Sequence, residues 1–115
     1  MHEVSLVHAL FDQADRVIAP HPCGAVREMK VRIGELAGVD CELFRTAFDV
    51  CRAERGYASA ALEIVEEQAL WRCGDCAANV PADGPLRCGS CDGEAKLSAG
   101  GDLILDRLEL EIVDA

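Results

Sequence analysis

The sequence predicts an α/β fold that is interrupted by a small metal-binding insertion. Three observations support this prediction: two stretches with helical spacing of apolar residues, three stretches with strand patterns, and a cysteine-rich segment before the last strand. The chain has 115 residues, of which 50% are apolar and only 4% are aromatic. Aliphatic side chains must therefore fill most of a core that is thin for a chain of this length.

The first predicted elements are a helix over residues 3–19 and a strand over 26–36. Apolar residues of the helix recur at three- and four-residue intervals, and two prolines after it end the pattern. In the strand, Val31 and Ile33 alternate with polar or small neighbours. The apolar face of this helix consists of Leu6, Val7, Leu10, Phe11, Ala14, Val17 and Ile18.

A second helix is predicted over residues 41–53, followed by strands over 61–70 and 103–113. Asp40 is a good N-cap for this helix and Gly56 stops it. Residues 108–112 of the last strand alternate strictly between apolar and acidic residues. The stretch 61–70 also suits a helix by its Glu and Ala content; we assign it to a strand. The apolar face of the second helix consists of Leu43, Phe44, Ala47, Phe48 and Cys51.

Residues 71–99 have a different composition, rich in Cys, Gly, Pro, Asp and Ala and poor in large apolar side chains. Such a segment buries too little apolar surface to fold without a cross-link, such as a disulfide or a bound metal ion. We therefore predict two domains. One is an α/β domain formed by residues 1–70 together with 100–115, and the other is the insertion 71–99.

Two C-x-x-C units in this segment can provide the cross-link. Paired thiolates form the closed tetrahedral set that zinc prefers, so we predict a structural zinc site. Gly74 and Gly89 are expected to let the backbone bend within each unit. The alternatives are a rubredoxin-like iron site, a redox dithiol and a pair of disulfides; the last is disfavoured by the odd total of seven cysteines. The predicted zinc ligands are Cys73, Cys76, Cys88 and Cys91.

The charge balance limits the classes of partner. The chain has 11 basic and 21 acidic residues, for a formal net charge of −10, which argues against nucleic acid and favours basic proteins or cations. No apolar run is long enough for a transmembrane helix, so we expect no membrane association. Because residues 1–5 do not resemble a secretory signal, we expect a cytoplasmic protein.

The amino terminus offers a second candidate metal site. A free amine on Met1 next to the His2 imidazole provides two nitrogen donors, and the amide nitrogens of His2 and Glu3 complete a plane if the metal displaces their protons. Square-planar nitrogen ligation suits Ni(II) or Cu(II). From the residues alone this signal is weak, because the usual role of a terminal histidine is that of a solvated side chain.

Four pieces of the sequence follow one another along the chain: MHEVSLVHAL at 1–10, VRIGELAGV at 31–39, the two cysteine pairs, and GGDLILDRLELE at 100–111. In these pieces and in their order, the chain resembles the HypA/HybF family of hydrogenase maturation nickel chaperones. The resemblance implies a nickel domain of two helices packed on a three-stranded sheet, interrupted by a zinc-ribbon-like domain. It also implies Met1, His2 and Glu3 as the nickel-binding residues, with the Glu3 side chain supporting the site.

The resemblance further implies delivery of Ni(II) to the large subunit of [NiFe] hydrogenase, and in some relatives to urease, with a HypB-like GTPase as partner. No catalytic grouping or phosphate loop is recognisable, so we expect a metallochaperone that is not an enzyme and is a monomer or weak homodimer. The alternative is a zinc-ribbon adaptor that binds a basic protein and never carries nickel.

Several other residues have simpler expected roles. His8 is expected on the polar side of the first helix, exposed or at a partner interface, and Cys41 and Cys51 are expected to pack as small apolar residues. Trp71 is expected to pack at the root of the insertion, and the glutamates between residues 63 and 67 to form a solvated face.

Overall fold

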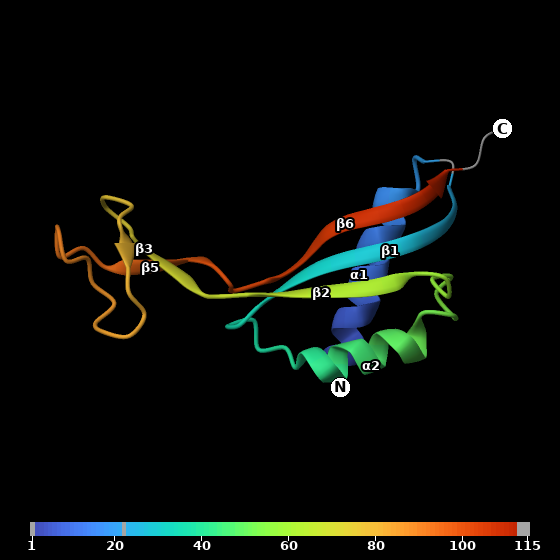
Figure 1. Ribbon diagram of the computed structural model, residues 1–115, viewed down its shortest axis with the longest axis horizontal. Helices are drawn as coiled ribbons and strands as arrows, with labels where there is room; N and C mark the ends of the chain where they lie inside the picture. Colours follow the sequence, from blue (N-terminus) through green and yellow to red (C-terminus); the bar gives the residue numbers. More distant parts are fainter. Residues whose placement is uncertain (1, 22, 113–115) are drawn as a thin grey trace.

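The chain forms two three-stranded sheets that follow one another along an elongated molecule of 58 × 32 × 17 Å (Figure 1). This computed structural model describes residues 2–21 and 23–112. Each sheet has its own cluster of buried apolar residues. We call the larger part, residues 2–67 and 103–112, the N-terminal lobe, and residues 70–99 the cysteine lobe.

The sheet of the N-terminal lobe is built around β1 (Cys23–Gly34), which pairs in parallel with β2 (Ala61–Glu67) and antiparallel with β6 (Leu103–Ile112). Apolar side chains alternate along β1, and those on one side are buried. Helix α2 (Cys41–Cys51) provides the crossover that a parallel pair requires. The three predicted strands of this lobe are therefore confirmed, although the stretch 61–70 ends as β2 at Glu67.

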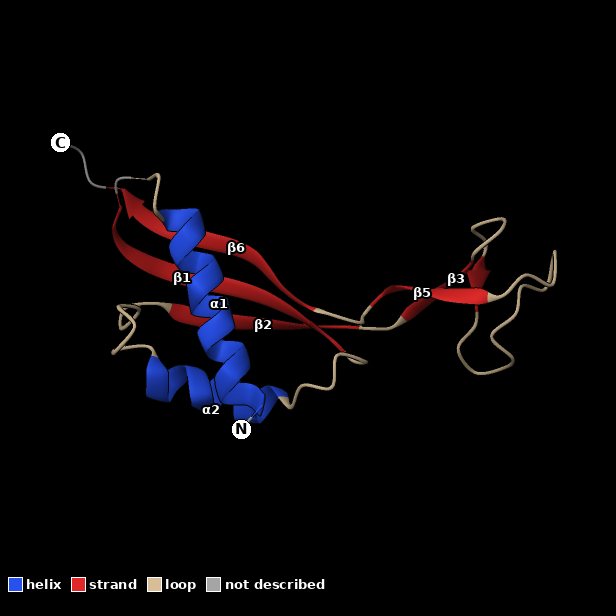
Figure 2. Ribbon diagram, turned by 180° about the vertical axis from the view of Figure 1, so that it is seen from behind, coloured by secondary structure: helices blue, strands red, loops and turns tan. Residues whose placement is uncertain are grey.

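Helix α1 (His2–Ile18) crosses one face of this sheet; it lies behind the sheet in Figure 1 and in front of it in Figure 2. Helix α2 lies beside β2, and the Arg45 guanidinium donates from the helix to the carbonyl of Leu62 in the strand (3.1 Å). Arg52, directly after the helix, donates to the carbonyl of Ala60, directly before the strand (2.9 Å). Both predicted helices and a fold of two helices on a three-stranded sheet are thus confirmed.

The core of the N-terminal lobe centres on three aromatic rings. The Phe11 ring lies 5.2 Å from that of Phe48 and 4.8 Å from that of Tyr57, between centroids. The predicted N-cap is also present, since the Asp40 carboxylate accepts hydrogen bonds from the amides of two residues in the first turn of α2. Val17 and Leu43 were expected in the core and are exposed, because each lies at the edge of the buried stripe of its helix.

Three chain segments meet where the two lobes join. Gly34 donates to the carbonyl of Asp102 (2.9 Å), and the amide of Glu35 donates to the carbonyl of Glu67 (2.8 Å). A Cβ atom on Gly34 would lie 2.1 Å from the carbonyl carbon of Gly100, so the backbones cross too closely for any side chain. The junction is therefore a packed crossing of β1, the end of β2 and the start of the segment that leads into β6.

Two carboxylates reinforce this junction. The Glu35 carboxylate accepts from the amide of Ala69 (2.8 Å), and the Glu67 carboxylate accepts from the amide of Gly100 (3.1 Å) and from Arg32 (2.9 Å). The expectation that residues 63–67 form a solvated face is therefore wrong for Glu67. Buried or half-buried backbone amides at a crossing need acceptors, and this side chain supplies one.

The cysteine lobe is a small antiparallel sheet in which β3 (Leu70–Cys73) lies between β4 (Asn79–Val80) and β5 (Ala95–Ala99). The chain enters this lobe after β2 and returns from it into β6, as expected for an insertion (Figure 1). Trp71 packs against its small cluster of buried residues. The division into two domains, residues 1–70 with 100–115 and residues 71–99, stays a prediction.

Candidate metal centres

The structure brings the four predicted cysteines of the insertion together. Their sulfur atoms all lie within 4.8 Å of one another, and three of the pairs are 3.3, 3.6 and 3.7 Å apart. A tetrahedral site with metal–sulfur bonds of about 2.3 Å places its sulfurs about 3.8 Å apart, whereas a disulfide bond is about 2.05 Å long. The spacing therefore fits one ion held by four thiolates, and these four cysteines are unpaired.

The first C-x-x-C unit forms a turn around the sulfur of Cys73. The amides of Asp75 (3.4 Å) and Cys76 (3.5 Å) donate to this sulfur, and the amide of Cys73 donates to the carbonyl of Ala78 (2.8 Å). Ala77 takes a positive φ of 63°, which turns the chain back toward β3. Backbone donors aimed at a sulfur favour its thiolate form, the form that binds metal.

The second unit repeats this construction. The amide of Ser90 donates to the sulfur of Cys88 (3.4 Å), the amide of Cys88 donates to the carbonyl of Gly93 (2.9 Å), and Asp92 has a positive φ of 58°. The expectation that Gly74 and Gly89 provide the bend is wrong. The left-handed conformation falls on the residue after each C-x-x-C pair, not on the glycine within it.

Gly93 is a residue of this site that sequence analysis missed. A Cβ atom there would lie 2.7 Å from the Cys73 sulfur and 2.6 Å from a carboxylate oxygen of Asp75. Only glycine lets the backbone approach the cluster this closely. The signal in the sequence was a Gly at the fifth position after Cys88, but that spacing is interpretable only once the turn is known.

Electrostatics explain why the cluster needs a cation. Amide hydrogen bonds from Cys91 and Ser90 lower the pKa of the Cys88 thiol to about 6, and those from Cys76 and Asp75 lower the pKa of Cys73. The adjacent sulfur of Cys73 in turn raises the pKa of Cys91 to about 12. Two thiolates are thus favoured by the backbone, and the remaining two thiols lose their protons only when a metal ion offsets the repulsion.

Acidification is therefore expected to release the bound metal. Because the lowered pKa of Cys88 is about 6, its thiolate is present above that pH and is lost as the pH falls through it. Protons then compete with the metal for the sulfur. Metal analysis after dialysis at neutral pH and at about pH 5 checks this expectation; full metal retention at the lower pH would contradict it.

The amino-terminal candidate lies in the N-terminal lobe, where the start of α1 meets the start of α2 (Figure 1). Met1 lies outside the described residues, whereas His2 and Glu3 open α1 with side chains that are 60% and 17% exposed. Amides in the first turn of a helix have no acceptor within the helix. The backbone amides of His2 and Glu3 therefore have no acceptor within the helix, and the Glu3 amide instead donates to its own carboxylate.

Glu3 is held in place from another element. Its carboxylate accepts from the backbone amide of Asp40 at 3.3 Å and lies 3.6 Å from the Nδ1 atom of His2. The Asp40 amide lowers the pKa of the Glu3 carboxyl, so Glu3 carries its negative charge beside the chain terminus. This contact, between residues 37 apart in sequence, was not predictable from the sequence.

Other candidate residues have different surroundings from those expected. His8 is half-buried and contacts Arg55 and Cys51, so the expectation of a fully exposed histidine is wrong, whereas a place at a partner interface stays a prediction. Cys51 is buried as expected, and Cys41 is partly buried against the same core. Within residues 2–21 and 23–112, the four-cysteine cluster is the one group of three or more potential ligands close enough to share an ion.

The fold and the site define a class of protein: a small α/β metal-handling protein with an inserted four-cysteine metal centre. In the described part of the chain, no helix has the length and apolarity needed to cross a membrane. Residues 1–110 match the HypA family model, described as hydrogenase/urease nickel incorporation metallochaperone. The chain belongs to the HypA family, and the resemblance inferred from the sequence is confirmed.

Individual relatives agree with this assignment along the whole chain. The chain is 33% identical over 113 residues to the hydrogenase maturation factor HypA of Shewanella halifaxensis, covering 96% of this chain and 98% of that protein. It is also 33% identical over 117 residues to the HypA of Solidesulfovibrio magneticus, covering 96% of this chain and 100% of that protein.

Solved structures give the same result. The solution structure of the Ni metallochaperone HypA from Helicobacter pylori has a TM-score of 0.75 and 26% identity, with 96% of this chain and 98% of that chain covered. A second HypA solution structure has a TM-score of 0.79 and 27% identity, with 96% and 97% covered. The fold is thus shared with these proteins over nearly the whole chain.

Proposed function

We propose that this protein is a nickel metallochaperone that binds Ni(II) at its amino terminus and delivers it for maturation of [NiFe] hydrogenase. The observation that carries the proposal is the match of residues 1–110 to a nickel-incorporation family, in a chain that begins Met1-His2-Glu3. The protein acts as a carrier, not as an enzyme. Urease is a second client suggested by the description of the family.

The proposed nickel site uses nitrogen atoms of the first three residues. The Met1 amine, the amides of His2 and Glu3 and the His2 imidazole supply four nitrogens, a set that suits square-planar Ni(II). Two features support this arrangement: the first-turn amides lack helical acceptors, and the Glu3 carboxylate is held next to His2 by the Asp40 amide. The negative charge of Glu3 also favours a cation there.

The proposed ion of the cysteine lobe is a structural Zn(II) bound by Cys73, Cys76, Cys88 and Cys91. Four thiolates close the coordination shell, leaving no position for a substrate or for nickel exchange. On this proposal, residues 1–70 and 100–115 form the nickel-binding domain and residues 71–99 form the zinc domain. The proposed partners are a HypB-like GTPase and the hydrogenase large subunit, in the cytoplasm where the precursor is synthesised.

Substitution of His2 by Ala is expected to abolish stoichiometric nickel binding while leaving zinc content unchanged. The imidazole is one of four in-plane donors, and no other proposed ligand replaces it. Equilibrium dialysis of the untagged, zinc-loaded protein with nickel measures the effect. A residue added before Met1 is expected to have the same effect, because it displaces the terminal amine.

The exposed His21 provides a matched control, since a His21→Ala variant loses an imidazole that is outside the proposed site. This variant is expected to bind nickel as the unmodified protein does. Retained nickel affinity in His2→Ala would refute the terminal site. Absence of nickel binding in the unmodified protein would leave the zinc-ribbon adaptor as the better account.

A further inference from the structure

Helix α2 carries large apolar side chains on a side that is exposed to solvent. Leu43 and Val50 are 55% and 75% exposed, the two highest values among the large apolar side chains of the described chain. They lie seven residues apart, which places them on the same side of the helix, with Thr46 between them. The Thr46 hydroxyl donates to the carbonyl of Glu42 at 3.0 Å, so it needs no polar partner from outside. We call Leu43, Thr46 and Val50 the outer seam of α2.

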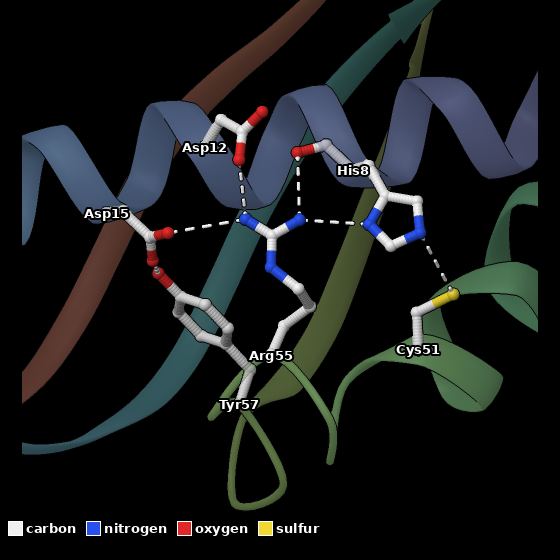
Figure 3. Close-up of polar contacts among 6 residues, drawn as sticks. All are labelled: His8, Asp12, Asp15, Cys51, Arg55 and Tyr57. Atoms are coloured by element: carbon white, nitrogen blue, oxygen red, sulfur yellow. Dashed lines mark hydrogen bonds and ion pairs between the residues drawn. The ribbon is translucent and has the colours of Figure 1, made fainter.

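The outer seam is not needed to hold α2 in the N-terminal lobe. Arg45 and Arg52 donate to carbonyls in or directly before β2. In the turn after α2, Arg55 donates to the carboxylates of Asp12 and Asp15 on α1 (Figure 3). These contacts and the buried face fix the helix from its inner side. The outer seam is therefore a preformed surface, and a partner that binds there does not have to order it. The buried face consists of Phe44, Ala47, Phe48 and Cys51.

The same contacts turn the basic groups away from the outer seam. The charged residues next to the seam are Glu42 and Asp49, which directly precede Leu43 and Val50 and are also seven residues apart. Within residues 2–21 and 23–112, Glu42 has no ion pair, and Asp49 has only a long one, at 3.9 Å to Arg52. Charges that flank an apolar stripe decide which helix is accepted as a partner. This seam therefore favours a partner helix with basic side chains.

A second copy of the chain is a poor occupant of this surface. Pairing of two α2 helices about a two-fold axis presents the same surface from both copies. The row of Glu42 and Asp49 would then face the same acidic row of the other copy. Each chain also has a formal net charge of −10. Like charges that meet across an interface oppose association, so the complementary occupant is basic.

We propose that the outer seam of α2 is a docking surface for an amphipathic helix of a partner protein, with an apolar stripe flanked by lysine or arginine. The stripe would cover Leu43 and Val50, and the basic side chains would pair with Glu42 and Asp49. Seven residues of helix extend over about 10 Å, so the contact is small and suits a transient complex. No residue of this surface is a proposed metal ligand.

The probe for this surface is a synthetic peptide of about three heptads, with Leu at the two stripe positions and Lys at the flanking positions. A matched peptide carries Glu in place of each Lys. Repulsion between like charges keeps each peptide from pairing with itself. Fluorescence anisotropy at about 0.15 M salt, with the untagged, zinc-loaded protein, is expected to show at least about tenfold tighter binding of the Lys peptide. Equal binding of both peptides, or binding of neither, would overturn the proposal.

A variant that combines Leu43→Ser with Val50→Ser tests the apolar part of the seam. It is expected to bind the Lys peptide about tenfold more weakly or worse, because the buried apolar contacts are lost. Circular dichroism is expected to show an unchanged fold, since both side chains are exposed. Val17→Ser is the matched control, because Val17 is an exposed valine of α1 outside the seam. Retained affinity in the double variant, or an equal loss in Val17→Ser, would refute the assignment of this surface.

A variant that combines Glu42→Lys with Asp49→Lys tests the charges. It is expected to reverse the preference, so that the Glu peptide binds more tightly than the Lys peptide. An unchanged preference would contradict the proposal. Analytical ultracentrifugation of the unmodified protein tests the second copy as occupant. No dimer that depends on the seam is expected, and a dimer that disappears in the variant with Leu43→Ser and Val50→Ser would show that the chain itself covers the seam, against the proposal.

Discussion

Replacement of Cys88 by Ser is expected to abolish metal binding in the cysteine lobe and to unfold that lobe, while the N-terminal lobe stays folded. The buried cluster of the cysteine lobe contains Cys73, Val80, Cys88 and Ala95, so two of its four members are proposed metal ligands. Structural zinc contributes on the order of 10–16 kcal/mol to folding in small zinc peptides. So small a core does not replace that contribution.

Metal analysis and amide spectra of the variant measure both parts of this expectation. Signals from residues 70–99 should collapse into the range of unfolded chains, and signals from α1 and β1 should persist. Cys41→Ser is the matched control, because Cys41 lies in the N-terminal lobe outside the cluster, and this variant should keep its metal. One equivalent of metal in Cys88→Ser, with dispersed signals from the lobe, would contradict the expectation.

Replacement of Gly100 by Ala is expected to destabilise the junction between the lobes strongly. Gly100 has a φ of +86°, and a Cβ atom there would lie 2.6 Å from both the Cα of Ala69 and the carbonyl oxygen of Gln68. Both contacts are with backbone, which cannot rotate away. Strain from the positive φ, about 1–3 kcal/mol, is therefore combined with a steric overlap of similar cost.

Gly56 allows these two costs to be separated. It has a similar φ of +88°, but an added Cβ atom would meet nothing within 4 Å. We expect the free energy of unfolding of Gly56→Ala to fall only by the cost of backbone strain. In Gly100→Ala it is expected to fall by about 1–3 kcal/mol more. Urea denaturation followed by circular dichroism and by fluorescence of Trp71, the single tryptophan, reports on both lobes. Equal losses of stability in the two variants would contradict this expectation, because they would show that the backbone at the junction moves aside to accept the added Cβ atom of Gly100→Ala without cost.

Most of the fold could be predicted because the elements have local signatures. The apolar residues of α1 and α2 follow the helical period of 3.6 residues, and those of β6 follow the strand period of 2 residues. Both periods can be recognised within a single element. The break between β2 and β3 was missed, because residues 61–70 read as one apolar-polar stretch. Only the crossing at Gly34 and Gly100 explains why the chain changes sheets after Glu67.

The candidate sites divide in the same way. The two C-x-x-C units could be paired from spacing alone, whereas the role of Gly93 depends on how both turns enclose the sulfurs. His8 was misplaced for a related reason. Its helical position predicts a polar face, but the residue that covers this face, Arg55, is 47 positions away in the sequence.

By itself, the sequence determined the helices, the strands of the larger sheet and the four-cysteine cluster, because each depends on the spacing of residues that are close in the chain. It also determined the HypA family, because the family's motifs occur in a fixed order. The tertiary structure alone decided which groups meet across the chain: Glu3 with the Asp40 amide, His8 with Arg55, and Gly100 with the backbone of Ala69. Such contacts depend on how whole elements pack around a shared core. Packing sums many weak interactions over distant residues, and no local pattern records it.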